Sequence, residues 1–223
     1  MNDASPPDQS LGGVGTVAPA PGRHSLALKP LTLVTLAWAV LCLGTLAALM
    51  IYKQAPGAMQ FACHEQDSGL PDREDLAPYR LVMAVHPKCP CSTASVRQLE
   101  RLLARTGSQM SVTMLAYRPS RAPADWERTP LAARAQSVAN AQRIVDDNGQ
   151  IAARLGLCTS GATVLYGPDG VPLFSGGITP SRGHEGDCTG ADAVLAAVQG
   201  RRVPVSTAPV YGCSLDMNPS AEL

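Results

Sequence analysis

Two cysteines separated by a single proline lie where a predicted strand ends and a predicted helix begins. Residues 81–85 read LVMAV, a short apolar run typical of a strand that is buried on both faces. Across residues 96–103, apolar side chains recur at spacings of three and four with charged side chains between them, which predicts an amphipathic helix. The junction, residues 86–92, reads HPKCPCS. The order of strand, cysteine motif and helix therefore restricts the chain to an α/β fold with both thiols near a helix N-terminus.

The position of these two cysteines suits redox chemistry. The unpaired amides and the positive dipole end of a helix favour a thiolate over a thiol. Lys88 adds a positive charge beside Cys89, and Ser92 or Thr93 is suited to cap the helix. The alternative is a pair of structural cysteines in the core, against which the charged Lys88 and the intervening proline both argue.

The cysteine motif leaves more than one pairing open. Cys89 can attack a partner's disulfide with Cys91 resolving the mixed disulfide, or the two cysteines can act in the opposite order. A bridge between residues i and i+2 satisfies the Cα separation that a disulfide needs, although its small ring is strained. A further arrangement is Cys89 with Ser92 in a Cys-x-x-Ser motif and a distant resolving cysteine such as Cys213. His86 either raises the thiolate population as a cation or hydrogen-bonds the end of the strand.

An uncharged run near the N-terminus predicts a transmembrane helix. Residues 30–52 contain no charged side chain and are long enough, as a helix, to cross a hydrocarbon core of about 30 Å. Residues 1–29 are rich in Pro, Gly, Ser and Ala without a hydrophobic period, which predicts a disordered, flexible tail. A cleaved signal peptide is the alternative, but the polar lead is too long for one and no small-x-small cleavage site follows.

The part of the chain after this run is expected to lie in the periplasm or at the cell exterior. Arg23 and Lys29 precede the run and only Lys53 follows it closely, a bias that favours a cytoplasmic N-terminus. Six of the seven cysteines follow the run, a number tolerated in oxidising compartments. Residues 53–77 have the composition of a linker, and residues 78–216 have the length of one compact domain. The zero net charge and 16% charged residues point to no nucleic-acid partner.

Along the domain, patterns typical of strands and helices alternate before an antiparallel hairpin. Besides the strand and helix that flank the cysteines, the patterns predict strands at residues 110–117, 143–146, 162–166 and 171–175 and helices at residues 131–141, 149–155 and 191–199. Residues 118–130, with three prolines and three arginines, are expected to form a loop. The turn of the hairpin reads GPDG, in which Pro presets φ and Gly accepts a positive φ. These elements predict a central mixed β-sheet with helices on both faces.

This order of elements, with a cysteine motif opening the first helix, resembles the thioredoxin fold. Three segments further resemble a small group of bacterial thioredoxin-like proteins labelled RedB: HPKCPC at residues 86–91, FSGGITPSRGHEGD at residues 174–187 and PVYGC at residues 209–213. The resemblance implies a thioredoxin-like fold, redox chemistry at the two cysteines, a protein thiol or disulfide partner and no bound cofactor. Two features depart from the thioredoxin pattern. The cysteines are separated by one residue instead of two, and Ala162 stands where thioredoxins place a cis-proline.

The resemblance also implies two basic residues near the cysteines. In a thioredoxin-like fold, the loop after the last hairpin strand approaches the start of the first helix, which brings Arg182 and His184 towards Cys89 and Cys91. A basic wall of this kind stabilises a thiolate or orients a partner. The alternative is that polar side chains of this loop only hold a glycine-rich segment in place by hydrogen bonds.

The predicted function is that of a membrane-anchored, extracytoplasmic thiol–disulfide oxidoreductase or redox partner. Its expected site residues are Cys89, Cys91, His86, Arg182 and His184. One alternative is a Cu(I)-type metal-binding module whose ligands are His86, Cys89 and Cys91. His184 is a candidate fourth ligand. The other alternative is a non-catalytic scaffold in which the motif forms a structural bridge.

Four cysteines outside the motif also follow the apolar run. They are Cys63, Cys158, Cys188 and Cys213. These cysteines can form structural pairs, and the sequence does not choose among the three connectivities that four cysteines allow. Cys158 precedes the strand expected to face the motif, which makes it the strongest candidate for an additional redox thiol.

Overall fold

The computed structural model describes residues 28–58, 70 and 77–215. Almost all of the tail predicted over residues 1–29 lies outside the described residues, as does most of the predicted linker with Cys63. The chain divides into two compact units, residues 1–47 and residues 48–223.

The uncharged run forms one long helix, α1 (Leu28–Gln54), which is apolar on all sides. Lys29–Gln54 contains an 18-residue window with a mean hydropathy of 2.3, so this helix is long and apolar enough to cross a membrane. Among the described residues, the exposed large apolar side chains lie in α1, with Val171 as the exception. This much exposed apolar surface is typical of a membrane anchor or a signal sequence.

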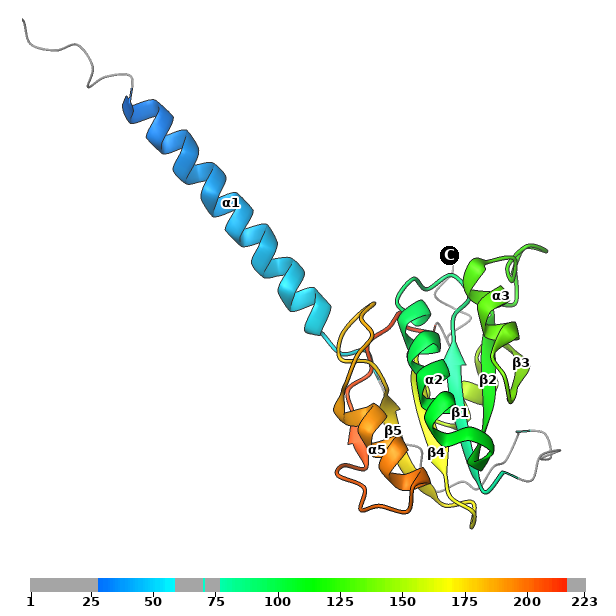
Figure 1. Cartoon of the computed structure of the whole chain (residues 1–223). Coiled ribbons are helices and arrows are strands. Elements are labelled where there is room, and N and C mark those ends of the chain that lie inside the picture. The colour runs from blue at the N-terminus through cyan, green and yellow to red at the C-terminus, as the bar shows by residue number, and fades with distance from the viewer. Residues whose placement is uncertain (1–27, 59–69, 71–76, 216–223) are drawn as a thin grey trace, which may run out of the picture. The chain divides into compact units, whose positions relative to one another are not determined.

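Six strands form one mixed sheet in the order β3-β2-β1-β4-β5-β6 (Figure 1). The strands are β1 (Tyr79–Val85), β2 (Met110–Arg118), β3 (Ala141–Asp147), β4 (Ala162–Tyr166), β5 (Pro172–Gly177) and β6 (Thr207–Ala208). β1, β2 and β3 run parallel, β4 pairs antiparallel with both β1 and β5, and β6 runs parallel to β5. The central strand β1 is buried from its second residue to its last, as its apolar sequence predicts.

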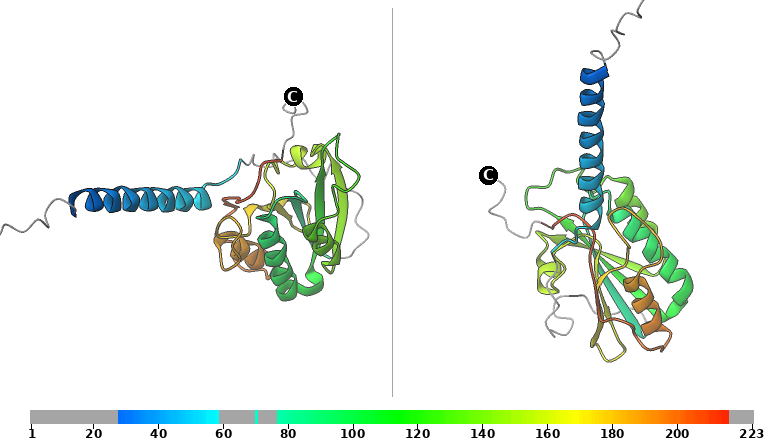
Figure 2. Two further views of the ribbon diagram at one scale, coloured as in Figure 1. Left: turned by 90° about the horizontal axis from the view of Figure 1, so that it is seen from above. Right: turned by 90° about the vertical axis from the view of Figure 1, so that its left-hand side faces the viewer.

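Helices cover both faces of this sheet. They are α2 (Ser92–Thr106), the 3-10 turn η1 (Gly107–Gln109), α3 (Pro130–Ser137), α4 (Gln150–Arg154) and α5 (Thr189–Val198). Helices α2 and α5 lie side by side on one face (Figure 2), and Leu81 and Met83 of β1 pack into the core on that side. The alternate residues of β1 enter a second core, formed with α4 and the C-terminal residues Val210 and Leu215. The C-terminal segment is therefore part of the domain's packing.

This arrangement confirms the predicted α/β class. The parallel β1-α2-β2 unit, the β4-β5 hairpin and the following α5 stand in the order that the thioredoxin resemblance implies. Helix α2 buries its apolar stripe, including Val96 and Leu99, against the sheet. It ends at Gly107, whose φ of 57° is one that glycine adopts without steric cost.

The helix predicted over residues 131–141 is shorter than expected. It ends at Ser137 because Val138 is extended, and Asn140 adopts a left-handed φ of 56°. The helix therefore ends four residues earlier than predicted, and β3 begins at Ala141. The alanine-rich composition of residues 131–141 favours a helix, but pairing of β3 with β2 places residues from 141 onwards in the sheet.

The last hairpin strand is longer than the predicted 171–175. β5 includes Gly176 and Gly177, because β6 approaches this end of the strand. A Cβ atom at Gly176 would lie 2.5 Å from the Ala208 carbonyl oxygen, so glycine permits the close approach of the two backbones.

Candidate functional site

The cysteine motif lies in the turn that joins β1 to α2, as the sequence predicts. The N–H of Cys89 donates to the His86 carbonyl at 3.0 Å, and the N–H of Ser92 donates to the Cys89 carbonyl at 3.2 Å. The N-cap of α2 is Cys91, which makes no side-chain capping bond. The expected cap by Ser92 or Thr93 is therefore wrong. Ser92 lies inside the first turn, where its side chain is available to the neighbouring sulfur.

The Cys89 sulfur is buried and surrounded by hydrogen-bond donors. Its side chain is 2% exposed. Burial raises the pKa of Cys89, but hydrogen bonds from the Cys213 and Ser92 side chains and from the backbone of the same two residues outweigh it, so the pKa lies below that of an ordinary thiol. Cys89 is thus the thiol of this site that favours the thiolate form.

The two neighbouring thiols have the opposite tendency. Burial, the hydrogen bond to Cys89 and the negative charges of Cys89 and Cys91 raise the pKa of Cys213 to about 12. Burial and the negative charge of Cys89 also raise the pKa of Cys91, although Arg182 partly offsets this. A thiolate at Cys89 therefore has a protonated thiol at Cys213 as its donor. The described cysteines are all free thiols, including Cys158 and Cys188, so none of the structural pairs considered from the sequence is formed among them.

Cys213 is held at the site by the C-terminal strap, which we define as residues 209–215 (Figure 1). The Ser160 N–H donates to the Cys213 carbonyl at 2.8 Å, and the Leu215 N–H donates to the Cys158 carbonyl at 2.9 Å. Thr159 and Ser214 form an antiparallel bridge between these two bonds. The strap thus pairs, in antiparallel fashion, with the loop that precedes β4.

A glycine permits this close pairing. A Cβ atom at Gly212 would lie 1.9 Å from the Ser160 carbonyl oxygen, so no other residue fits there without displacing the backbone. The Gly212 carbonyl accepts a hydrogen bond from Arg182 Nη1. Arg182, which follows β5, also hydrogen-bonds to the Cys91 side chain. One guanidinium therefore connects the strap to the cysteine motif.

Of the two basic residues expected at Cys89 and Cys91, Arg182 hydrogen-bonds to Cys91, and His184 bonds within its own loop. His184 is exposed, and its Nδ1 lies 2.7 Å from the Arg182 carbonyl oxygen. The His184 N–H donates to the Ser181 carbonyl, which closes a tight turn. His184 thus orders the backbone that presents Arg182.

His86 and Lys88 belong to an aromatic cluster beside the motif. The His86 ring stacks on Tyr117 with centroids 5.4 Å apart, and its Nδ1 accepts the Lys88 N–H at 3.1 Å. The Lys88 ammonium lies 4.4 Å from the centre of the Trp126 ring. The expectation that Lys88 supplies charge to Cys89 is not met, because this cation is held over the indole.

Sequence reasoning missed Ser160. Its Oγ accepts the His86 N–H at 2.7 Å and lies 2.5 Å from Ser92 Oγ. A hydroxyl has one proton, and Ser92 uses its proton for Cys89, so Ser160 must donate to Ser92. The two hydroxyls thus relay hydrogen bonds from the end of β1 to the sulfur. The available signal was a polar pair, Thr159 and Ser160, directly before a buried strand.

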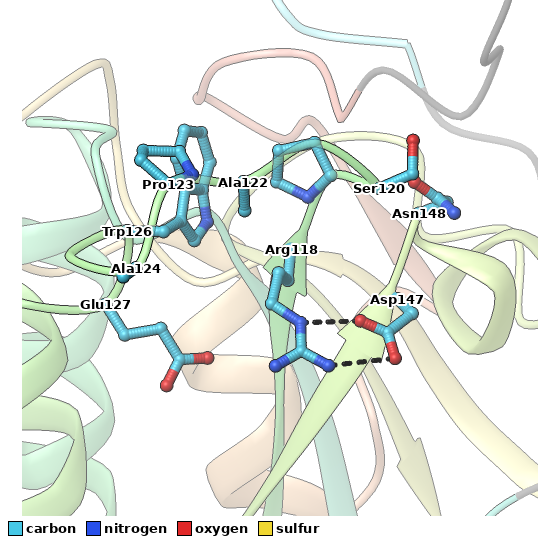
Figure 3. Close-up of a pocket in the computed structure, with 10 residues that line it drawn as sticks. Arg118, Ser120, Ala122, Pro123, Ala124, Trp126, Glu127, Asp147 and Asn148 are labelled. Atoms are coloured by element: carbon cyan, nitrogen blue, oxygen red, sulfur yellow. Dashed lines mark hydrogen bonds and ion pairs between the residues drawn. The ribbon is translucent and has the colours of Figure 1, made fainter.

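A cavity of about 530 Å³, lined in part by Trp126, opens at the carboxyl ends of β2 and β3 (Figure 3). Arg118 and Asp147 form its floor through two parallel bonds of 2.6 Å and 3.0 Å. Carboxyl ends of parallel strands commonly bind ligands. This arginine is already paired with Asp147, however, and none of the described cysteines lines the cavity. Within the described residues, no group of three or more His, Cys, Asp or Glu side chains has an arrangement that could hold a metal ion.

Comparisons with known proteins support the fold. No protein-family model and no curated protein matches the sequence. An uncharacterized conserved protein from Geobacillus kaustophilus matches 76% of this chain and 96% of its own, at 18% identity and a TM-score of 0.55. A hypothetical protein from Sinorhizobium meliloti matches 74% of this chain and 96% of its own, at 20% identity and a TM-score of 0.52.

A third solved structure is a secreted disulfide oxidoreductase from Mycobacterium tuberculosis that is homologous to E. coli DsbE. It matches 55% of this chain and 81% of its own, at 18% identity and a TM-score of 0.36. That TM-score is too low to support an inference from one protein to the other.

Proposed function

We propose that this protein is a membrane-anchored thiol–disulfide oxidoreductase, or the redox partner of one, with Cys89 as its nucleophile. The observation that carries the proposal is the set of donors around the Cys89 sulfur. Two backbone groups and two side chains, all from Ser92 and Cys213, lower the pKa of a thiol whose burial alone would raise it. A buried structural cysteine does not need a lowered pKa. The attacking thiol of a disulfide exchange does, because it reacts as the thiolate.

The reaction proceeds by two successive thiol–disulfide exchanges. The Cys89 thiolate forms a bond to one sulfur of the partner's disulfide, whose S–S bond breaks, and the other sulfur leaves as a thiolate that takes up a proton. A second thiol of this chain then loses its proton and attacks the Cys89 sulfur, which releases the partner as a dithiol. Two electrons pass to the partner, and this chain is left with an internal disulfide. The reverse sequence oxidises a partner's dithiol.

The other residues of the site act on this pair of steps. Arg182 supplies a positive charge that favours a thiolate at Cys91 or Cys213. Its charge partly offsets the effects that raise the pKa of both thiols. His86 and His184 serve as positioning residues. His86 accepts the N–H of Lys88, the residue before Cys89, and His184 bonds to the carbonyl of Arg182. The domain works on the periplasmic or external side of the membrane, where disulfides persist. The similarity of three sequence segments to the RedB group agrees with this role.

The proposal is tested by replacing the nucleophile. With the full chain in detergent micelles and dithiothreitol as electron donor, Cys89→Ser should reduce insulin disulfides no faster than dithiothreitol alone. Cys188→Ser is the matched control. Cys188 is the N-cap of α5 and accepts the Ala191 N–H at 3.5 Å, a position that serine fills well, so this variant should keep wild-type activity. Wild-type activity in Cys89→Ser would show that Cys89 is not the nucleophile. A wild type that is no faster than dithiothreitol alone would instead indicate a non-catalytic scaffold.

A further inference from the structure

Two thiols compete for the second step of the proposed reaction. The side chains of Cys91 and Cys213 both hydrogen-bond to Cys89. Cys91 is separated from Cys89 by one proline and has helical backbone angles, φ −65° and ψ −31°, as the N-cap of α2. A bridge between them closes a small ring at the rigid start of a helix, which strains the disulfide. Cys213 comes from the other end of the domain, and its bridge to Cys89 closes no such ring.

The strap that carries Cys213 blocks access to the nucleophile. Cys89 is 2% exposed, and both the thiol and the backbone of Cys213 contact its sulfur. The partner's disulfide therefore reaches Cys89 only after the strap has moved away. The strap is held at the Cys158–Ser160 loop by backbone bonds of 2.8 Å and 2.9 Å. Backbone bonds of this kind are the ones by which an extended peptide pairs with a protein strand, so an extended segment of the partner is suited to replace the strap.

We infer that Cys213 is the resolving cysteine, carried on a C-terminal strap that yields to the partner and returns to complete the reaction. This inference rests on the proposed function. In the returning step, Cys213 loses a proton to solvent, its sulfur forms a bond to Cys89, and the bond between Cys89 and the partner breaks. The partner's sulfur leaves as a thiolate and takes up a proton.

The pKa of Cys213 depends on whether Cys89 carries a negative charge. Burial, together with the hydrogen bond to Cys89 and the negative charge there, raises the pKa of Cys213 to about 12 while Cys89 is free. Once the Cys89 sulfur is part of a mixed disulfide, its charge is gone, while the favourable effect of Arg182 remains. The pKa of Cys213 therefore falls at the step that requires its thiolate.

The experiment uses oxidised glutathione as the disulfide and the reduced full chain in detergent micelles. Samples are quenched with acid, alkylated and digested with trypsin, which separates residues 89–97 from residues 203–223. In the wild type, these two peptides should become joined by a disulfide. In Cys213→Ser and Cys213→Ala, glutathione should instead remain on Cys89. In Cys91→Ser, the joined peptides should still form, and Cys188→Ser should behave as the wild type.

The outcomes separate this inference from the proposed function. If the wild type forms an internal bridge within peptide 89–97 and Cys91→Ser retains glutathione, then Cys91 resolves the mixed disulfide. The inference is then wrong and the proposed function stands. If Cys89 carries neither glutathione nor an internal disulfide in the wild type and in the Cys213 variants, the proposed function itself fails. Because the wild-type peptide pattern decides between Cys91 and Cys213, the test remains valid even where a Cys213 variant does not fold.

Discussion

At the scale of single residues, the chemistry of the nucleophile depends on Cys213 and on two serines. A thiol that is 2% exposed ordinarily keeps its proton, because burial disfavours the charged form. Cys89 departs from this rule since Cys213 and Ser92 each donate to it from both side chain and backbone. Ser92 can point its proton at the sulfur because Ser160 satisfies its oxygen from the other side. Ser92, together with Ser160, thus provides part of the thiolate stabilisation that the sequence analysis assigned to Lys88.

Ser92→Ala should raise the pKa of Cys89. A hydrogen bond to a charged group contributes about 1.5–3 kcal/mol, and one pKa unit corresponds to about 1.4 kcal/mol, so the midpoint should rise by about one unit or more. The thiolate is the reactive form, so alkylation by iodoacetamide should slow by about tenfold at neutral pH. The rates should converge above both midpoints, where Cys89 is ionised in either protein.

The measurement follows alkylation of peptide 89–97 across pH in a Cys91→Ser background, which leaves one thiol in that peptide. Thr93→Ala, one residue further along α2, is the control and should leave the midpoint unchanged. An unchanged profile in Ser92→Ala would mean that the hydroxyl does not donate to the sulfur.

At the scale of elements, the C-terminal strap decides whether Cys89 can be reached. Gly212→Ala places a Cβ atom where the Ser160 carbonyl oxygen lies 1.9 Å away, so the strap must shift. Alkylation of Cys89 measured well above its pKa reports access alone, and it should be faster in this variant than in the wild type. Gly170→Ala, in the turn of the β4–β5 hairpin, is the control for backbone strain. Its φ is 75° and no atom lies within 4 Å of the added Cβ. Equal rates in Gly212→Ala and the wild type would show that the strap does not limit access.

The strap also marks the limit of what the sequence reveals. The strand at residues 81–85 and helix α2 were predictable because their periodicity is local, and so was the meeting of Cys89 with a helix start. The strap has no hydrophobic period, and its position depends on Thr159 pairing with Ser214 across the domain. The sequence therefore offered Cys213 only as one of several resolving cysteines. Lys88 was misjudged for the same reason, since Trp126 lies in a distant loop.

At the scale of the whole molecule, the chain combines a thiol site with an apolar helix. The proposed disulfide exchange needs a compartment in which partner disulfides persist, and the cytosol keeps thiols reduced. Lys29–Gln54 is long and apolar enough to cross a membrane, which fits either a retained anchor or a signal sequence. A retained anchor keeps the domain beside partners at the membrane surface, whereas a signal sequence releases it.

The retained anchor makes a prediction for the full chain in intact bacteria. The protein should stay with membranes after alkaline carbonate extraction, and its intact mass should include residues 28–54, because an uncleaved apolar helix partitions into lipid.

A membrane-impermeant maleimide should label a cysteine placed at Gln199, the exposed C-cap of α5, without disruption of the cells. A cysteine placed at Ser5 should be labelled only after the cells are lysed, because the basic residues before the helix favour a cytoplasmic N-terminus. Both labelling variants carry serine at all seven native cysteines, so that the introduced thiol is the one that reacts. A mature mass lacking the helix would identify a signal sequence. Labelling of Ser5→Cys alone in intact cells would show the opposite orientation, with the thiol site in a reducing compartment.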